Sequence, residues 1–211
     1  MTYRMRQDAD RIIAAALRAV QPDAAVQRAL AAAELTGTIY MVAAGKAAWQ
    51  MAKAASDALP GRIAAGVVVT KYDHVMGEIP NTVCVEAGHP VPDENSFRGT
   101  QTALDLVAKA GAGDTVLFLL SGGGSALFEK PRIPAEELQD ITGQLLASGA
   151  DIVEMNTIRK RLSAVKGGRF AQLCAPAKVF SIVLSDIIGD PLDMIASGPA
   201  VPDRSTCEQA L

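Results

Sequence analysis

The sequence predicts an α/β domain in which a mostly parallel sheet is covered by helices on both faces. Short runs of strand-forming residues alternate along the chain with longer segments of helical periodicity, the pattern typical of parallel sheets. The run Thr115–Leu120 is apolar at every position after Thr115, as expected of a central strand buried on both faces. No internal repeat, low-complexity tract or linker divides the 211 residues, so we expect one domain, 1–211, with a sizeable core.

The first half of the chain alternates helices and strands. Apolar residues at helical spacing from Ile12 to Val20 predict a first helix. Pro22 is suited to the start of a second, alanine-rich helix, because proline is tolerated in the first turn. The elements expected next are a strand at 38–44, an alanine-rich helix at 47–59, and strands at 66–70 and 82–86.

The second half continues the alternation. We expect helices at about 94–110, 134–148 and 154–166, with strands at 115–120 and 179–184. Gly167-Gly168 would then serve as the C-cap of the third helix. Near the end of the sequence, Ser205 and Glu208 have the spacing of a capping box, which normally opens a helix. Since too few residues follow to make that helix, we expect this chain to be a fragment of a longer protein.

Composition excludes several classes of protein. The chain is 49 % hydrophobic and 20 % charged, which is ordinary for a globular protein. A net charge of −3 gives no electrostatic footprint for nucleic acid. The N-terminus lacks a signal-peptide core, and no run approaches the roughly 18 apolar residues of a membrane span. Three well-separated cysteines, Cys84, Cys174 and Cys207, indicate reduced thiols in a cytoplasmic protein.

The strongest candidate site is the loop Ser121-Gly122-Gly123-Gly124-Ser125, directly after the central strand. Open parallel sheets bind ligands at the carboxyl ends of their strands. Glycines let the backbone turn with positive φ, and its free N–H groups can cradle phosphate or carboxylate. A tight turn without a ligand is the alternative. A dinucleotide fingerprint starting at Gly122 is excluded, because Leu127 stands where its third glycine would be.

The first strand ends at Gly45-Lys46. A P-loop would need a glycine where Tyr40 stands and a serine or threonine where Ala47 stands, so this is not one. Lys46 is nevertheless a candidate point charge for a phosphate, with a solvated surface lysine as the alternative.

The third strand is followed by His89 between glycine and proline. Pro90 and Pro92 hold this segment stiff, which suits His89 to act as a base or to orient a substrate hydroxyl. A structural histidine that caps the turn fits equally well. Asp93 in the same segment reads as a helix cap.

Polar residues also follow a helical pattern late in the chain. Asn156, Arg159, Ser163 and Lys166 fall on one stripe of the predicted helix 154–166, as a binding face or as an ordinary basic surface. Asp186 ends the last strand, where an aspartate beside a phosphate loop commonly holds Mg²⁺. Asp190 is either a second ligand or a turn residue.

Taken together, six blocks of this sequence resemble the glycerate 2-kinases, a family sometimes mislabelled as hydroxypyruvate reductase. Any one block is weak evidence, but six in order from 42 to 199 are specific. They are Val42–Ala47, Gly88–Asp93, Leu120–Leu127, Met155–Ser163 with Lys166–Gly168, Leu184–Asp190 and Ala196–Pro199.

The resemblance implies an enzyme that transfers the γ-phosphoryl group of ATP to the 2-hydroxyl of D-glycerate, with Mg²⁺ or another divalent metal. It implies a three-layer Rossmann-like N-terminal domain here, and a C-terminal domain, absent from this chain, across the active-site cleft. The isolated chain is then expected to have little activity. The resemblance does not decide between a monomer and a homodimer.

The resemblance also implies residue roles. Lys46 and Asp186 become catalytic, with Asp186 as a metal ligand or base and Asp190 as a weaker metal candidate. The implied substrate- or nucleotide-binding residues are Gly45, His89, Ser121, Gly122, Gly123, Gly124, Ser125, Asn156, Arg159, Lys166, Ser197 and Gly198. Two alternatives remain. An NAD(P)H-dependent hydroxypyruvate reductase is disfavoured by the missing fingerprint, and a non-catalytic phosphosugar-binding domain would use a similar loop.

Overall fold

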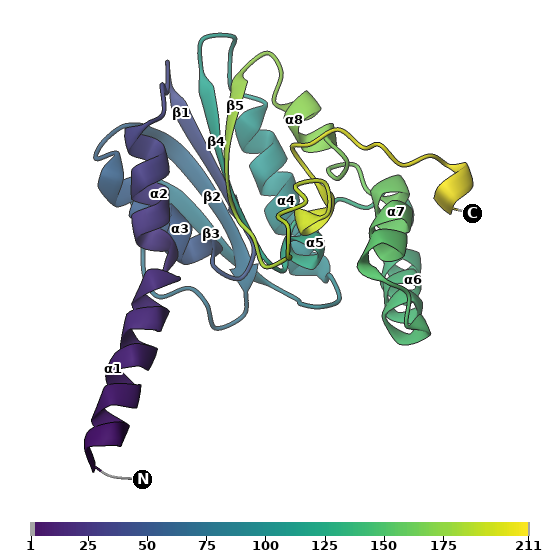
Figure 1. Cartoon of the computed structure of the whole chain (residues 1–211). Helices are drawn as coiled ribbons and strands as arrows, with labels where there is room; N and C mark the ends of the chain where they lie inside the picture. Colours follow the sequence, from purple (N-terminus) through teal and green to yellow (C-terminus); the bar gives the residue numbers. More distant parts are fainter. Residues whose placement is uncertain (1–2, 211) are drawn as a thin grey trace.

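A five-stranded sheet forms the centre of the molecule. The computed structural model describes residues 3–210. All neighbouring strands are parallel, and their order is β3-β2-β1-β4-β5 (Figure 1). This confirms the predicted α/β class and all five predicted strands. The strands are β1 (Ile39–Ala44), β2 (Ile63–Lys71), β3 (Thr82–Ala87), β4 (Thr115–Ser121) and β5 (Lys178–Leu184).

Helices cover both faces of the sheet, so the domain has three layers. The helices α2 (Pro22–Ala31) and α3 (Ala48–Ala58) pack on one face, against Met41 and Leu117 among others. The other face is covered by α4 (Glu94–Val107), α5 (Gly124–Leu127) and α8 (Arg169–Leu173). There Phe118, Phe128 and Phe170 pack together, with ring centroids 4.6 to 5.7 Å apart. Every residue of β4 is buried, as predicted for the central strand.

The strand order creates a switch point between β1 and β4. The chain leaves β1 toward α3 on one face and leaves β4 toward α5 on the opposite face. Open α/β sheets bind ligands where two such connections diverge. Here a cavity at the carboxyl ends of β1 and β4 is lined by Lys46 and by Ser121. Both predicted anion loops, at Lys46 and at 121–125, therefore lie at this point.

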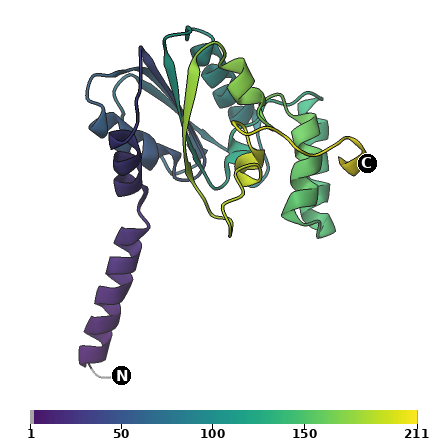
Figure 2. The ribbon, with the colours of Figure 1, turned by 45° about the horizontal axis from the view of Figure 1, so that its top comes forward.

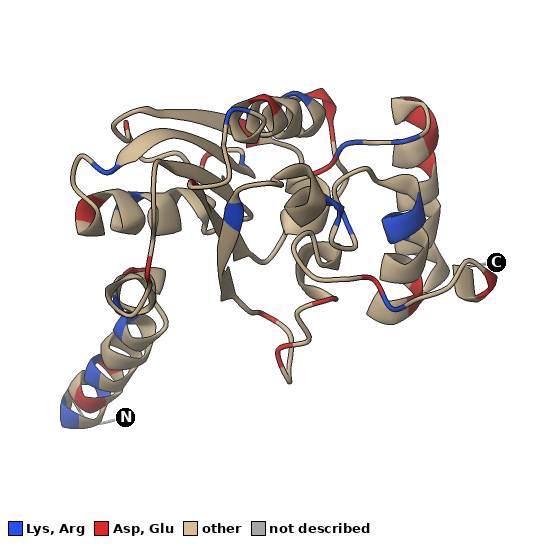
Figure 3. Cartoon of the chain, turned by 90° about the horizontal axis from the view of Figure 1, so that it is seen from above, with Lys and Arg blue, Asp and Glu red and all other residues tan. Residues whose placement is uncertain are grey.

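Three helices lie away from the sheet. The helices α6 (Ala135–Ser148) and α7 (Ile152–Leu162) stand beside the C-terminal segment, which carries the short turns η1 (Ile195–Ser197) and η2 (Glu208–Ala210) (Figures 1 and 2). Helix α1 (Tyr3–Ala19) projects from the body, and none of its residues is buried. In the described part of the chain, no helix is long and apolar enough to cross a membrane. Acidic and basic residues are interspersed over the ribbon (Figure 3).

The predicted helix 154–166 is wrong at its C-terminal end. Helix α7 stops at Leu162, and Ser163 has extended dihedrals of φ −114° and ψ 142°. Ser163 forms an antiparallel bridge with Pro131, and the Ala164 N–H donates to the Lys130 carbonyl (2.8 Å). This tertiary pairing competes successfully with the last helical turn. Gly168, at φ 82°, consequently caps the start of α8 rather than the end of α7.

Of two predicted helix starts, the structure confirms one and shifts the other. Pro22 does occupy the first turn of α2. The expected capping box at Ser205 and Glu208 is displaced by one residue. It is Thr206 and Gln209 that exchange hydrogen bonds, with side-chain oxygens accepting from each other's backbone N–H.

Candidate functional site

The loop 121–125 turns from β4 into α5 as predicted. Gly123 has φ +87°, a conformation that favours glycine. The Lys46 N–H donates to the Gly122 carbonyl (2.9 Å) and the Ala47 N–H donates to Ser121 Oγ (3.0 Å), which ties this loop to the one after β1. Among the described residues, the N–H groups of 123–125 find no acceptor. They are therefore available to an anionic ligand.

The glycines also let three of the predicted site side chains approach one stretch of backbone. A Cβ on Gly122 would collide with the Asp186 carboxylate. A Cβ on Gly123 would lie 3.0 Å from His89 Cδ2 and 3.1 Å from Lys46 Cγ. The loop is thus the point where Lys46, His89 and Asp186 converge from three different strand ends. Gly45 is required for a similar reason, since a Cβ there would collide with Ser121.

Two cavities meet at this loop. The larger, of about 600 Å³, is lined by His89, Ser125, Arg159 and Asp186, among mainly apolar neighbours. The smaller, of about 300 Å³, contains Lys46, Ser121 and Ser185. Gly122 and Asp186 line both cavities. Two ligands could therefore sit side by side, with Asp186 at their junction.

The surroundings of His89 favour the neutral form of its imidazole. Burial is the largest cause that lowers the pKa of its imidazole, and the positive charges of Lys46, Lys71 and Arg159 lower it further. Asp186 acts in the opposite direction but more weakly. A neutral imidazole at neutral pH can accept a proton, so His89 is suited to act as a general base.

Lys166, an expected anion contact, is fully buried and lines neither of these cavities. Its ammonium group lies 2.7 Å from Glu129 Oε2 and donates to the Phe128 carbonyl (3.1 Å). Burial lowers the pKa of Lys166, and the neighbouring Glu129 opposes that shift. No local sequence pattern predicts this pair, because Glu129 is 37 residues away from its partner.

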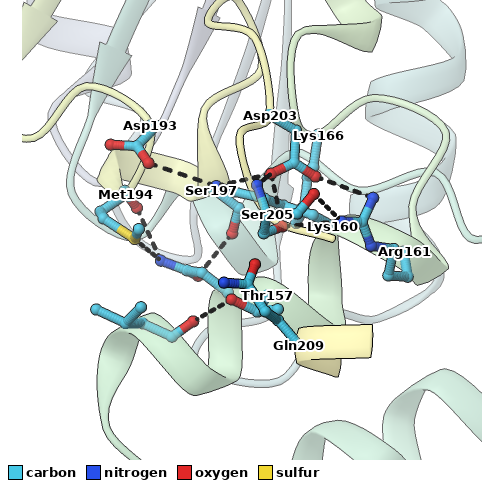
Figure 4. Close-up of polar contacts among 12 residues, drawn as sticks. Thr157, Lys160, Arg161, Lys166, Asp193, Met194, Ser197, Asp203, Ser205 and Gln209 are labelled. Carbon is cyan, nitrogen blue, oxygen red and sulfur yellow. Dashed lines mark hydrogen bonds and ion pairs between the residues drawn. The ribbon is translucent and has the colours of Figure 1, made fainter. Parts of the chain in front are cut away.

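The surface-helix alternative for α7 is also wrong, because Asn156 and Lys160 are buried. Lys160 Nζ lies 3.7 Å from Asp193 and 3.5 Å from Asp203, which connects α7 to the C-terminal segment (Figure 4). Sequence patterns mark neither Lys160 nor Asp203 as a site residue. Ser163 is buried beyond the end of α7 and Arg159 alone of the predicted stripe reaches the larger cavity.

The remaining candidates lie outside the two cavities. Ser197 is fully buried, and Gly198 lines a separate cavity against β4 and β5. Asp190 is exposed, at φ +50°, on the loop that follows β5. Asp93 caps α4 in a reciprocal capping box with Ser96, in agreement with the expected helix cap.

The fit of a divalent metal depends on Asp186. Within residues 3–210, no group of three or more metal-ligating side chains is found. Magnesium is usually bound through one or two carboxylates together with substrate phosphates and waters. Asp186, at the junction of the cavities, fits that arrangement, whereas a metal cage made entirely of protein ligands does not.

Comparison with known proteins gives consistent matches over nearly the whole chain. The family model DUF4147, described as a domain of unknown function, matches residues 8–211. The D-glycerate 2-kinase of Thermotoga maritima is 56 % identical over 95 % of this chain and 48 % of its own length. The glycerate 2-kinase of Pyrococcus horikoshii is 42 % identical, with the same two coverages.

A solved structure agrees with the sequence matches. The crystal structure of the glycerate kinase of Thermotoga maritima superposes with a TM-score of 0.92 at 53 % identity, over 99 % of this chain and 51 % of that one. The chain thus spans about half the length of the curated relatives it matches. On the family match over residues 8–211, this chain belongs to the DUF4147 family.

Proposed function

We propose that this chain is the N-terminal, Rossmann-like domain of an ATP-dependent glycerate 2-kinase. The enzyme would transfer the γ-phosphoryl group of ATP to the 2-hydroxyl of D-glycerate and release 2-phosphoglycerate. The observation that carries the proposal is the junction of two cavities at Gly122 and Asp186, with Lys46 on one side and His89 and Arg159 on the other. The similarity to the two glycerate 2-kinases supports the same reaction.

The geometry suits phosphoryl transfer for a physical reason. Such transfer depends on holding donor and acceptor in line and on stabilising the charge of the transferring group. Two cavities that share one wall hold two ligands next to each other. The exposed Lys46 ammonium and the N–H groups of 123–125, which find no acceptor within residues 3–210, would stabilise phosphate oxygens beside that wall.

Asp186 and His89 complete the proposed chemistry. A magnesium ion, held by Asp186 together with phosphate oxygens, would neutralise charge on the nucleotide. Asp190, on the same loop, remains a proposal for a further ligand. His89 would accept the proton of the attacking hydroxyl, because its lowered pKa keeps the imidazole neutral.

A second domain would complete the site. Since the relatives are about twice as long as the match, we propose that their remaining half supplies the opposite wall of the cleft. The apolar side chains exposed on α1, including Ile12, Ile13 and Leu17, offer a surface for that domain or for a second copy of the chain. The three free thiols fit a cytoplasmic location.

The test is titration of the full-length protein with Mg-ATP and D-glycerate, together with an assay for D-glycerate-dependent formation of ADP. Binding of both ligands and formation of ADP are expected. No binding and no product would refute the proposal. Oxidation of NADH with hydroxypyruvate would instead indicate a reductase, and binding of sugar phosphates without affinity for ATP would indicate a non-catalytic domain.

A further inference from the structure

A chain of hydrogen bonds leads from the larger cavity into the protein interior. Ser125 lines the cavity, and its Oγ lies 3.1 Å from Ser197 Oγ. Ser197 Oγ lies 2.8 Å from Asn156 Oδ1, and Asn156 Nδ2 lies 3.1 Å from the Met194 carbonyl oxygen (Figure 4 shows Ser197 and Met194). Ser197 and Asn156 are both fully buried. These hydroxyl and amide groups therefore depend on one another for their partners.

The direction of this chain of hydrogen bonds is fixed at its inner end. A carbonyl oxygen only accepts, so Asn156 must present its NH₂ group to Met194 and its oxygen to Ser197. That amide oxygen also only accepts, so the single hydroxyl proton of Ser197 is donated to it. In the contact between the two serines, Ser125 must therefore be the donor and Ser197 Oγ the acceptor. The reverse direction would leave a buried amide oxygen of Asn156 unpaired, which is unfavourable.

This direction decides how Ser125 can bond to a ligand in the larger cavity. Because the only hydroxyl proton of Ser125 is donated to Ser197, its Oγ offers lone pairs to a ligand and no proton. A carboxylate or phosphate oxygen would be repelled at this point, whereas a donor would bind. Arg159 lines the same cavity, and together with Ser125 it also lines a narrower gap. The apolar side chains of Met155 and Ile152 line the cavity as well.

We infer that Ser125 recognises a hydroxyl group of the ligand by accepting its hydrogen bond, and that Ser197 and Asn156 are positioning residues that impose this role. With Arg159 nearby for a carboxylate, the larger cavity is suited to a hydroxy acid. The choice of D-glycerate rests on the proposed function. Its 3-hydroxyl is the expected partner, because the 2-hydroxyl must give its proton to a base. The ribose of a nucleotide could supply the same donor chemistry.

The experiment compares dissociation constants, measured by calorimetric titration of the full-length protein. D-glycerate is paired with D-lactate, which lacks the 3-hydroxyl, and ATP is paired with 2′-deoxy-ATP and 3′-deoxy-ATP. In the unmodified protein one hydrogen bond should favour the hydroxylated member of a pair by about tenfold. Ser125→Ala should reduce that preference to about twofold or less. Ser197→Ala, which frees the Ser125 proton, should reduce it in the same direction.

The ratio within a pair separates recognition from folding, because a general structural defect weakens both ligands alike. If the variants no longer prefer D-glycerate over D-lactate, the inference is supported and the hydroxyl belongs to the hydroxy acid. If the variants lose only the preference for ATP over its deoxy analogues, the inference is supported and the hydroxyl belongs to the ribose. Both preferences unchanged in both variants would overturn it. If the preference is lost but no 2-phosphoglycerate forms in a separate assay, the proposed function fails while this inference stands.

Discussion

The ammonium group of Lys166 lies 2.7 Å from Glu129 Oε2, and both side chains are almost completely enclosed. Removing one member of such a pair leaves a buried charge without a partner. We therefore expect Glu129→Leu to lower the free energy of unfolding by about 3 to 5 kcal/mol. Urea denaturation followed by circular dichroism would measure the loss.

A matched control is the pair Lys53 and Asp57 on α3, whose ammonium and carboxylate are 2.6 Å apart but well exposed. Lys53→Ala should cost less than about 1 kcal/mol, because solvent screens the exposed pair. The double replacement of Glu129 by Leu and Lys166 by Met should recover most of the lost stability. A Glu129→Leu cost no larger than that of Lys53→Ala would contradict the buried pair.

Gly122 tests the convergence of side chains at the switch point. Gly122→Ala would force the Asp186 carboxylate out of its position, because the new Cβ collides with it. Displacing a group in the site by about 1 Å can reduce turnover about a hundredfold, so we expect a loss of that order with Mg-ATP and D-glycerate. Gly113→Ala is the control, since nothing lies within 4 Å of a Cβ there and it should leave turnover unchanged. Equal activity of the two variants would show that the position of Asp186 does not matter.

The pH dependence of His89 follows from its surroundings. Burial and nearby positive charges hold the pKa of its imidazole below 6.5 in the folded state. The unfolded chain therefore binds more protons than the folded chain as the pH falls from 6.5 to the lower pKa of the folded state, and stability is lost over that range. NMR titration should give a midpoint below 6.5, and Lys46→Met should raise it. A midpoint at or above 6.5, or no response to Lys46→Met, would contradict this description of the site.

The elements at the centre of the sheet could be predicted because their signals are local. The run at Thr115–Leu120 and the glycines after it specify strand and turn within a few residues, and the carboxyl-end rule then brings Lys46, His89 and Asp186 together. The end of α7 could not be predicted in this way. Ser163 leaves the helix to pair with Pro131, and helical periodicity carries no information about a partner 32 residues earlier.

In the candidate site, too, only the residues with a local sequence signal could be placed correctly. The residues at strand ends reach the cavities, whereas Asn156, Lys166 and Ser197 are buried behind them. A polar residue that faces a cavity and one that satisfies a buried partner look alike in sequence. The sequence predicts either an anion contact or a surface position for Lys166, and its buried contact with Glu129 is visible only in the fold.

Thiol reactivity tests the packing independently of any ligand. Burial raises the pKa of Cys174 to about 12, and it also raises the pKa of Cys84. Cys207 is exposed. A disulfide reagent at pH 8 should therefore modify Cys207 rapidly and Cys174 only after unfolding, because the thiolate is the reactive form. Mass spectrometry of digested samples would assign the sites, and rapid labelling of Cys174 in the folded protein would contradict the structure.

Lys46 should matter for turnover far more than for folding. Its side chain is exposed beside Gly123 and the smaller cavity, so Lys46→Met should leave the urea midpoint nearly unchanged. Loss of an electrostatic stabiliser of the transferring group should lower kcat by about a hundredfold or more. Lys53→Ala again provides the control for an exposed lysine. A loss of stability that accounts for the loss of activity would assign Lys46 a structural role.

The most direct test of the proposed reaction is the identity of its product. Full-length protein, Mg-ATP and D-glycerate would be incubated and the mixture followed by ³¹P NMR, which distinguishes the 2- and 3-phosphate esters of glycerate. We predict that 2-phosphoglycerate and ADP form together, and that Lys46→Met slows both equally. Formation of 3-phosphoglycerate, or of no phosphate ester, would contradict the assignment of this chain to a glycerate 2-kinase.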